Sequence, residues 1–336
     1  MALYIISFFL SFLLSIALTP VMRSLAHRYG IIDVPATSIK THKKSVAYLG
    51  GVAIWFSFII TMVIVRSLTH FPTGTLRDLR GLIFGGTIIM IVGLLDDMKG
   101  FNYKTKFMGQ LLATLILMTF DIRIKFIDNY VLSFIITLFW VVGVTNAFNI
   151  IDIMDGLSGG VAAVASLAFF FVALPTEQVY VNFASCILAG GCLGFLKYNW
   201  SPAKIFMGDS GSLFIGFMLA ATALGESYTS VNNLALFTPV LILGVPIFDT
   251  LLVMAIRLRQ GKSVFLGSKD HFALRLEAMG YERKKIVLLA YTISAFLGFS
   301  AFFITRVKFD MAVVIYLFIA FLAFLFATKL SAVKVK

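Results

Sequence analysis

The chain has 336 residues, of which 60% are hydrophobic and only 13% are charged, and its mean hydropathy is +0.97. Ordinary soluble domains are roughly 45–50% apolar and about 25% charged, so the composition excludes that class and indicates a membrane protein. The formal net charge is +12. The basic residues are divided among short loops, which argues against nucleic-acid binding and favours topology and attraction to anionic lipid headgroups.

Eleven apolar runs are candidates for membrane crossings, because a transmembrane helix needs roughly 20 mostly apolar residues. They lie near residues 2–22, 46–65, 81–95, 107–122, 130–148, 159–175, 180–196, 212–225, 234–256, 286–305 and 311–328. The short run at 81–95 continues backward through Leu76 and Leu79. The first run has no small-residue cleavage site, so we expect a retained helix and not a signal peptide. The fold class predicted is an all-α polytopic membrane protein, with one integral-membrane domain over residues 1–336.

The basic residues predict which side of the membrane each connecting segment occupies. With eleven crossings, one side holds 21 of the 28 Lys and Arg residues and the other side holds 7. The richer side comprises residues 23–45, 96–106, 149–158, 197–211, 257–285 and the C-terminal tail. Because cytoplasmic loops carry the excess of Lys and Arg, we place this side in the cytoplasm and the N-terminus outside.

Two adjacent acids, Asp96 and Asp97, end the third run in the stretch "GGTIIMIVGLLDDMKG". Carboxylates at the C-terminus of a helix oppose its macrodipole, so their placement there has a cost. They could simply mark a helix end among the lipid headgroups. With Lys99, Lys104 and Lys106 just beyond, they also suit the binding of a divalent metal ion or a phosphate.

Four polar residues recur every three positions in "NAFNIIDIMDGLSGG", at Asn146, Asn149, Asp152 and Asp155. Residues three apart are neighbours on a helix, so this spacing predicts a slanting polar ladder on one helical face, ended by Gly156. Apolar residues fill the other positions. Polar groups at this depth in a membrane segment are functional by default.

Three further polar segments fall on the predicted cytoplasmic side. The Gly-rich stretch Gly208–Ser212 precedes the eighth run and suits an anion at its backbone N–H groups, although a capping turn is an equal alternative. Asp249 in "PIFDT" is either functional or a satisfied intramembrane acid. His271 in "SKDHFALRL" could donate to a phosphate or be solvated, and it lacks the partner ligands of a zinc site.

Together these segments supply carboxylates and amides for one hard cation, and Lys, Arg and His for anions. Mg²⁺ is bound through one or two carboxylates and completes its shell with water and substrate phosphates. The sequence therefore predicts Mg²⁺-dependent chemistry, with Mn²⁺ as an alternative ion, on a phosphate compound at the cytoplasmic face. Placement among eleven helices suggests that one substrate is a lipid.

The motifs "LDDMKGFNYKTKFMGQ", "NAFNIIDIMDGLSGG", "FMGDSGSLFIG" and "PIFDT", in this order, resemble the polyprenyl-phosphate N-acetylhexosamine-1-phosphate transferases of glycosyltransferase family 4. That family includes the bacterial enzymes that start O-antigen and teichoic acid synthesis, and the peptidoglycan translocase. The resemblance implies a multi-pass protein of the bacterial cytoplasmic (inner) membrane. It further implies a UDP-sugar donor, a polyprenyl phosphate acceptor and release of UMP, and homodimers are common in the family.

The same resemblance assigns roles to residues of this chain. It assigns Asp96, Asp97, Asp152 and His271 to catalysis, Asp209 and Asn149 to Mg²⁺, and Lys40, His42, Lys106, Asn146, Asp155 and Arg275 to substrate binding. Asp96 would contact or deprotonate the lipid phosphate, and Lys106 would bind it. Whether an Asp acts as base or as covalent nucleophile stays open, and we favour direct attack by the lipid phosphate.

Two departures from the family pattern bear on the donor sugar. The segment often written H-x-H-H-R is here His271 to Arg275 with no further His, and "SVAYLGG" carries Tyr48 where relatives often have Arg. We expect UDP-GlcNAc, with UDP-GalNAc or a UDP-6-deoxy-aminosugar as alternatives, and the missing histidines disfavour a muramyl-pentapeptide donor. A secondary transporter would need ionisable residues near the midplane and two similar halves, and the intact acids disfavour a non-catalytic homologue.

Overall fold

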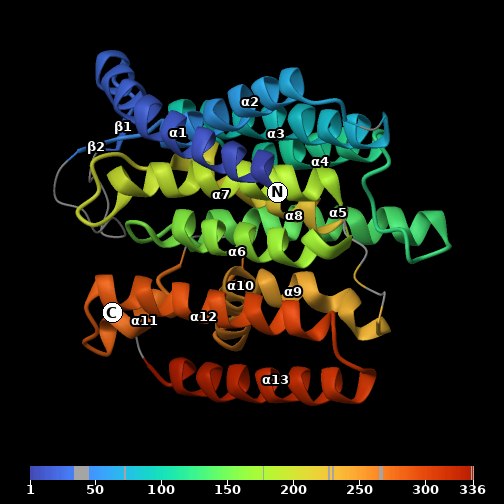
Figure 1. Cartoon of the computed structure of the whole chain (residues 1–336). Helices are drawn as coiled ribbons and strands as arrows, with labels where there is room; N and C mark the ends of the chain where they lie inside the picture. Colours follow the sequence, from blue (N-terminus) through green and yellow to red (C-terminus); the bar gives the residue numbers. More distant parts are fainter. Residues whose placement is uncertain are drawn as a thin grey trace. The chain divides into compact units, whose positions relative to one another are not determined.

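The computed structural model describes residues 1–33, 45–71, 73–176, 178–225, 228, 231–264, 268–333 and 335 (Figure 1). These residues form two compact units, Met1–Glu226 and Ser227–Lys336. Eight of the helices in this part of the chain are long and apolar enough to cross a membrane, or up to nine if one bent pair forms a single span. The all-α membrane fold is therefore confirmed, whereas the single domain over 1–336 stays a prediction.

The first unit consists of helices and one short antiparallel hairpin. Its elements are α1 (Ala2–Tyr29), β1 (Ile32–Asp33), β2 (Val46–Ala47), α2 (Gly50–Leu68), α3 (Thr73–Lys99), α4 (Tyr103–Thr119), α5 (Tyr130–Ile151), α6 (Leu157–Ala173), the short 3-10 helix η1 (Leu174–Thr176), α7 (Val179–Asn199) and α8 (Gly208–Ala223). The second unit comprises η2 (Asn233–Phe237), α9 (Thr238–Ile242), α10 (Gly244–Arg259), α11 (Phe272–Ala278), α12 (Arg283–Ile304) and α13 (Phe309–Ser331).

Each of the eleven apolar runs corresponds to a helix, or in one case to a broken pair of helices. The run at 81–95 lies inside the 27-residue α3, which confirms its backward extension. The run at 234–256 is divided between α9 and α10, which are bent by 76°. Helices α4 and α8 have only 17 and 16 residues, so eleven crossings, and the side that faces the cytoplasm, stay predictions.

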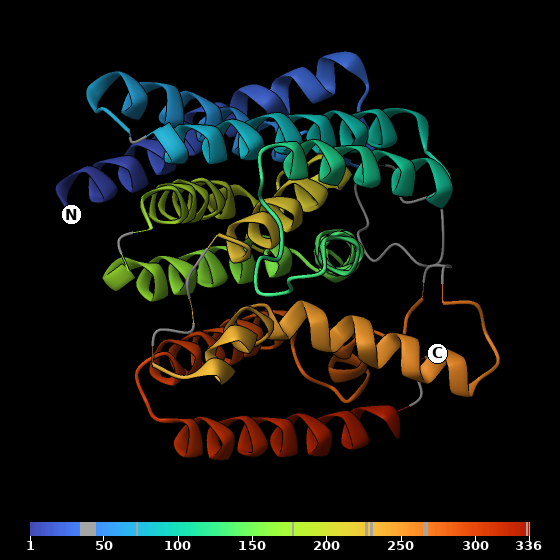
Figure 2. The same ribbon diagram turned by 90° about the vertical axis from the view of Figure 1, so that its right-hand side faces the viewer.

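Helix α8 lies among the other helices of the first unit (Figure 2). All of its residues except Asp209 are buried. It packs against α2, α3 and α5. Glycines allow this approach: a Cβ atom on Gly93 of α3 would lie 2.4 Å from the carbonyl oxygen of Asp209. A Cβ atom on Gly51 of α2 would lie 2.1 Å from the nitrogen of Gly211. The first turn of α8 is therefore held directly against two neighbouring backbones.

Helices α1 and α7 pack through small residues, as membrane helices commonly do. The hydroxyl of Ser11 donates to the carbonyl oxygen of Ile187 at 2.7 Å, and that of Ser15 donates to the carbonyl oxygen of Gly191 at 2.7 Å. A Cβ atom on Gly190 would lie 2.3 Å from a backbone oxygen of α1. Because lipid tails are as apolar as these helices, close packing and hydrogen bonds hold the pair together.

In the second unit, α13 carries large apolar side chains on its surface. Phe318, Phe321 and Phe324 are all more than half exposed, and only 6% of the most apolar window of this helix is buried. Such a continuous apolar surface is rare on a protein surrounded by water. It is the expected surface of a helix that faces lipid tails, and this agrees with the membrane assignment.

Candidate active site

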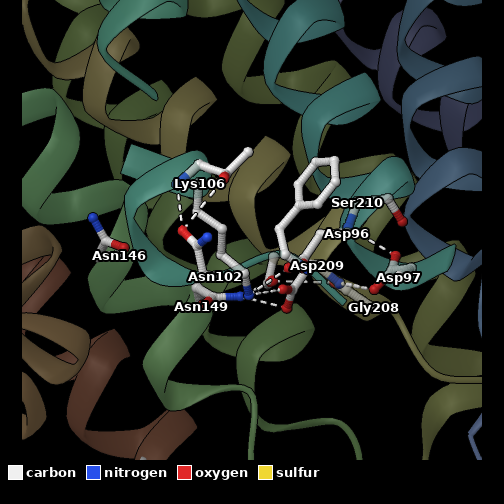
Figure 3. A network of polar contacts seen from close by, with 12 residues as sticks. Asp96, Asp97, Asn102, Lys106, Asn146, Asn149, Gly208, Asp209 and Ser210 are labelled. Carbon is white, nitrogen blue, oxygen red and sulfur yellow. Dashed lines mark hydrogen bonds and ion pairs between the residues drawn. The ribbon is translucent and has the colours of Figure 1, made fainter. Parts of the chain in front are cut away.

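The polar residues predicted from the loops meet at one end of the first unit. There the C-terminal ends of α3 and α5 lie beside the N-terminal ends of α4 and α8 (Figure 3). The N-terminus of α2 joins them, because the N–H of Gly50 donates to the carbonyl oxygen of Phe206 at 3.0 Å. The segments 96–106, 149–158 and 197–211 therefore lie together, as their shared side of the predicted topology requires.

The ammonium group of Lys106 is the hub of this site (Figure 3). Its Nζ pairs with Oδ2 of Asp96 on α3 and with Oδ2 of Asp209 on α8. Lys106 lies in the first turn of α4, which Asn102 caps by accepting the N–H of Thr105 at 3.0 Å. The side chains of Lys106 and Asp209 are about one quarter exposed, at 25% and 26%, so this shared cation is within reach of a ligand.

Asn149 joins α5 to the same carboxylate. Its Nδ2 donates to Oδ1 of Asp209 at 2.7 Å and to the hydroxyl of Ser212 at 2.9 Å. Both carboxylate oxygens of Asp209 thus have a partner, one amide and one ammonium. The site is built from side chains of α3, α4, α5 and α8, which are distant in sequence and are brought together by helix packing.

Asp97 has a different task from its neighbour Asp96. Its Oδ1 accepts the N–H of Asp209 at 2.7 Å, and its Oδ2 accepts the N–H of Ser210 at 3.0 Å. A carboxylate at the N-terminus of a helix satisfies N–H groups that have no partner within the helix, and it lies in the favourable field of the macrodipole. Gly208, with φ of +72°, is needed here because a Cβ atom would lie 2.5 Å from Asp97 Oδ2.

The predicted polar ladder on one helical face is wrong beyond its first two members. Helix α5 ends at Ile151, so only Asn146 and Asn149 lie on it. Asn146 forms a two-way amide pair with Gln110 of α4, with distances of 2.7 and 3.1 Å. The three-residue spacing was a sound signal for the helix, but the chain turns before it reaches the two acids.

Asp152 and Asp155 lie in the turn between α5 and α6. Asp152 follows the last residue of α5 and is half-buried. Burial, followed by the nearby charges of Asp209 and Asp97, raises the pKa of Asp152 to about 8. Asp155 accepts the N–H of Ala203 at 3.0 Å, which ties this turn to the segment before α8. Asp152 is therefore in electrostatic contact with the site, and Asp155 supports a neighbouring loop.

Tyr48, the departure from the family pattern before α2, is close to the same helix ends. Its backbone N–H donates to the carbonyl oxygen of Ile31 at 3.1 Å, and its ring lies 6.2 Å from that of Phe206. Burial, followed by the charge of Asp33, raises the pKa of the Tyr48 hydroxyl far above its usual value. The group at this position is thus a neutral phenol.

The remaining predicted site residues lie elsewhere. Lys40 and His42 fall outside the described residues. His271 belongs to the second unit, where its Nδ1 is 2.7 Å from Oδ2 of the buried Asp249. Both oxygens of Asp249 thus have partners, and a functional role for this acid stays a prediction.

Arg275 also belongs to the second unit, and its guanidinium is committed to protein groups. Its Nη2 pairs with Oδ1 of Asp270 at 2.5 Å, and its Nε donates to the backbone oxygen of Asp270 at 2.9 Å. Its Nη1 donates to the carbonyl oxygens of Leu330, at 3.0 Å, and Val333. A contact with the donor, which the resemblance implies for Arg275, stays a prediction, and the structure gives this side chain a clamping role.

Sequence reasoning missed several members of these networks. Gln110 is one helical turn after Lys106, so its position on the same face was a usable signal. Asp270 lies inside a motif that was singled out, beside its partners Ser268 and Arg275. Ser212 lies inside another such motif, but its hydrogen bond to Asn149, 63 residues away, leaves no local pattern. The capping of α8 by Asp97 was hidden for the same reason, because the two groups are more than a hundred residues apart.

The carboxylate and amide groups around Lys106 determine which metal ion the site could bind. Among the residues that the structure describes, no group of three or more His, Cys, Asp or Glu side chains could hold a metal ion. Asp96 and Asp209 do converge on one cation, and Asn149 adds an amide. Two carboxylates and an amide supply oxygen ligands, which fit Mg²⁺ with substrate oxygens and water completing its shell, and they do not fit zinc.

Residues 79–226 match the model of glycosyl transferase family 4. A probable undecaprenyl-phosphate N-acetylglucosaminyl 1-phosphate transferase of Bacillus subtilis is 31% identical over 306 residues, 88% of this chain and 84% of the relative. A decaprenyl-phosphate N-acetylglucosaminephosphotransferase of Mycobacterium tuberculosis is 33% identical, covering 83% and 77%. A phospho-N-acetylmuramoyl-pentapeptide-transferase of Acetivibrio thermocellus is 31% identical, covering 91% and 95%.

Proposed function

The chain belongs to glycosyl transferase family 4, and we propose that it transfers N-acetylglucosamine 1-phosphate from UDP-N-acetylglucosamine to undecaprenyl phosphate or a similar polyprenyl phosphate. The products are the polyprenyl diphosphate sugar and UMP, the first membrane step of a cell-surface glycan. The observation that carries this proposal is the ammonium of Lys106, shared by Asp96 and Asp209 with Asn149 beside them. This arrangement can receive two phosphates at the end of a helix bundle.

The reaction needs one bond to form and one to break. An oxygen of the lipid phosphate bonds to the phosphorus that carries the sugar, and the bond from that phosphorus to the UMP oxygen breaks. Lys106 would bind the lipid phosphate and offset the repulsion between two anions, as positive groups do at transferring phosphoryl centres. Asp96 would accept the proton of the lipid phosphate where it carries one. Holding both substrates at one site supplies proximity.

Mg²⁺, or Mn²⁺ in its place, would be held by Asp209 and Asn149 with Asp96 close by. When bound, the ion supplies positive charge to the pyrophosphate oxygens of the donor. Asp97 fixes the N–H groups of Asp209 and Ser210, so it sets the direction in which the Asp209 carboxylate faces. Asp152 would belong to the rim of the site, because its carboxyl group responds to the charges of Asp209 and Asp97.

The remaining roles follow from the family resemblance alone. Asp155 would contact the uracil, and Asn146 would lie on the substrate side of α5. Lys40, His42, His271 and Arg275 would meet the phosphates or the sugar of the donor. Of these, the Asp155 carboxylate already accepts a backbone N–H, so it would reach the uracil with its other oxygen.

The choice of donor sugar is supported by the names of the relatives and by the histidines that this chain lacks. Two of the relatives described above are named as N-acetylglucosamine phosphate transferases. The muramoyl-pentapeptide transferase is as similar in identity. The segment from His271 to Arg275 contains no further histidine, and this favours the smaller donor.

A donor panel tests the proposal. Purified protein is incubated with undecaprenyl phosphate, Mg²⁺ and, separately, UDP-GlcNAc, UDP-GalNAc and UDP-MurNAc-pentapeptide, and UMP release is followed. We expect UMP with UDP-GlcNAc and little with the other two donors. Release with another donor alone would correct the sugar, and no release with any donor from folded protein would contradict the reaction.

The protein is a multi-pass membrane protein, and the proposed location is the bacterial cytoplasmic membrane with the site on the cytoplasmic face. This location is supported by the distribution of basic residues, because that side carries 21 of the 28 Lys and Arg residues. Single cysteines introduced at Lys104 and at Asp128 would report the orientation through a membrane-impermeant thiol reagent. Labelling of the Lys104 position from outside intact cells would contradict it. A homodimer stays a prediction.

A further inference from the structure

The mechanism above makes no use of the most deeply buried acid of the second unit. Asp249 is the sixth residue of α10, three residues after Pro246, and its side chain has no exposed surface. A buried carboxyl group needs partners for its oxygens, because transfer from water without hydrogen bonds is costly. The partners of Asp249 are the two residues that begin α11.

Both oxygens of Asp249 are used on consecutive residues. Its Oδ2 is 2.7 Å from Nδ1 of His271, and its Oδ1 accepts the N–H of Phe272 at 2.7 Å. The first contact holds the imidazole ring, and the second holds the backbone beside it. The ring of His271 therefore cannot rotate without loss of one bond, nor shift along the chain without loss of the other.

The rest of this loop is anchored independently. Asp270 accepts the hydroxyl of Ser268 at 2.6 Å and pairs with Arg275. Arg275 also donates to the carbonyl oxygens at the end of α13. Of the two basic side chains that remain from the family segment, Arg275 is thus committed to protein groups. His271 keeps one ring nitrogen, Nε2, that makes no hydrogen bond within the described part of the chain.

We propose that Asp249 is a positioning residue that keeps the proton of His271 on Nδ1 and leaves Nε2 as the atom that meets a phosphate oxygen of the nucleotide-sugar donor. A carboxylate only accepts hydrogen bonds, so the nitrogen beside it carries the proton. A phosphate oxygen is likewise an acceptor, so in the complex Nε2 also carries a proton and His271 is an imidazolium. The identity of the ligand rests on the proposed function, whereas the proton position does not.

One substitution, Asp249→Asn, separates the contact with the Phe272 backbone from the contact with the His271 ring. In Asp249→Asn the amide oxygen can still accept the N–H of Phe272, so the start of α11 is kept. The amide nitrogen can only donate, so Nδ1 of His271 must accept and the ring proton moves to Nε2. The imidazolium then loses its partner. We expect the KM for the UDP-sugar to rise about tenfold or more, the usual scale for loss of such an orienting carboxylate, with the KM for the lipid unchanged.

The direct test is nitrogen NMR of protein labelled at histidine, in the wild type and in Asp249→Asn. The chain has four histidines, and His271→Gln identifies the signal. A wild-type His271 protonated on Nδ1, with the proton on Nε2 in the variant, supports the proposal. A wild-type signal with bare Nδ1 overturns it, and this result requires no variant to fold.

The kinetic arm uses Thr250→Val as its control, because Thr250 is the next residue of α10 and its hydroxyl donates only to Pro246 at 3.0 Å. An unchanged donor KM in Asp249→Asn, with the proton moved, would overturn the positioning role. A rise of the donor KM in Thr250→Val equal to that in Asp249→Asn would overturn it as well. Absence of UMP release from the wild type would count against the proposed function, and the NMR arm judges the proton position alone.

Discussion

The two units of the protein use charged residues in opposite ways. In the first unit, carboxylates from α3 and α8 share one ammonium, and both Lys106 and Asp209 are about a quarter exposed. In the second unit, two acids each have a partner of their own: Asp249 has His271 and Asp270 has Arg275, and none of these side chains is more than 17% exposed. The first arrangement shares one cation between two acids, and the second consists of separate, largely buried pairs, which we call closed pairs.

This difference separates groups that can receive a ligand from groups that hold the scaffold. A carboxylate that shares a cation keeps capacity for an additional positive charge. A buried pair is already satisfied, and removal of one member leaves an uncompensated charge, which costs about 3–5 kcal/mol. Substitutions in the first network should therefore act on turnover, and loss of Arg275 from its pair with Asp270 should act on stability.

The largest effect is expected for Asp96→Asn. The amide cannot accept a proton from the lipid phosphate and no longer attracts Lys106, so turnover should fall by about 10³-fold. The protein should still insert and elute as folded material in size-exclusion chromatography. Asp128→Asn, at an exposed loop position, is the control and should retain full UMP release. Near-normal turnover of Asp96→Asn would contradict its place in the site.

Gly93→Ala should lower turnover by displacing the start of α8, although it removes no polar or charged group from the site. The added Cβ atom would lie 2.4 Å from the Asp209 oxygen and 2.6 Å from the Cα atom of Ser210, so the start of α8 must move. A shift near 1 Å can cost about 100-fold in rate. Gly143→Ala on α5, where a Cβ atom meets nothing within 4 Å, should leave UMP release unchanged. Equal rates in the two variants would show that the approach of α3 to α8 is unimportant.

For the closed pairs, Arg275→Met should lower stability by about 3 kcal/mol, measured by thermal unfolding in detergent. Arg283→Met is the matched control, because its pair with Glu277 is one third exposed, at 37% and 34%, and should cost less than about 1 kcal/mol. If Arg283→Met destabilises as much as Arg275→Met, the distinction between closed and exposed pairs fails.

The closed pair of Asp270 and Arg275 predicts that the stability of the protein depends on pH. Burial opposes ionisation of Asp270, yet the hydrogen bond from Ser268 and the charge of Arg275 hold its pKa below the usual value. A lowered pKa in the folded state adds stability above the unfolded pKa, and this is lost as the pH falls through the folded pKa. The wild type should therefore lose more stability than Arg275→Met as the pH is lowered from about 6 to below the ordinary Asp pKa of about 4.

The smallest effect concerns the scaffold of the first unit. Ser11→Ala removes the hydroxyl that bonds to Ile187 at 2.7 Å, and bonds of this kind between membrane helices contribute about 0.6 kcal/mol. A slightly lower melting temperature with full turnover is expected. Ser67→Ala, whose exposed hydroxyl bonds within its own helix, should show no change. A loss of turnover in Ser11→Ala would mean that the scaffold and the site are coupled.

Much of the helical fold could be predicted because an apolar run of sufficient length has few alternatives in a membrane. The start of α4 at Tyr103 was not predicted, because the apolar run begins only at residue 107 and Asn102 supplies the cap. The bend between α9 and α10 was not predicted, because residues 234–256 are apolar on both sides of it. The end of α5 at Ile151 was missed because the polar spacing continues past it with helical periodicity.

For the site, sequence alone identified Asp96, Lys106, Asn149 and Asp209, because charged and amide groups have few other reasons to lie beside apolar helices. It could not divide the work between Asp96 and Asp97. That division depends on which carboxylate faces α8, and therefore on how α3 is rotated against a helix more than a hundred residues away. The partners of Arg275 at the end of α13 were hidden for the same reason, and its contact with the donor stays a prediction.

The central claim is that Asp209, with the Mg²⁺ ion proposed for it, supports transfer to a polyprenyl phosphate. The most direct measurement is UMP release from wild-type and Asp209→Asn protein with undecaprenyl phosphate and UDP-GlcNAc, in Mg²⁺ and after chelation with EDTA. The account predicts release only from the wild type in Mg²⁺, restored when Mg²⁺ is returned after EDTA. Equal release after EDTA, or from Asp209→Asn, would contradict it.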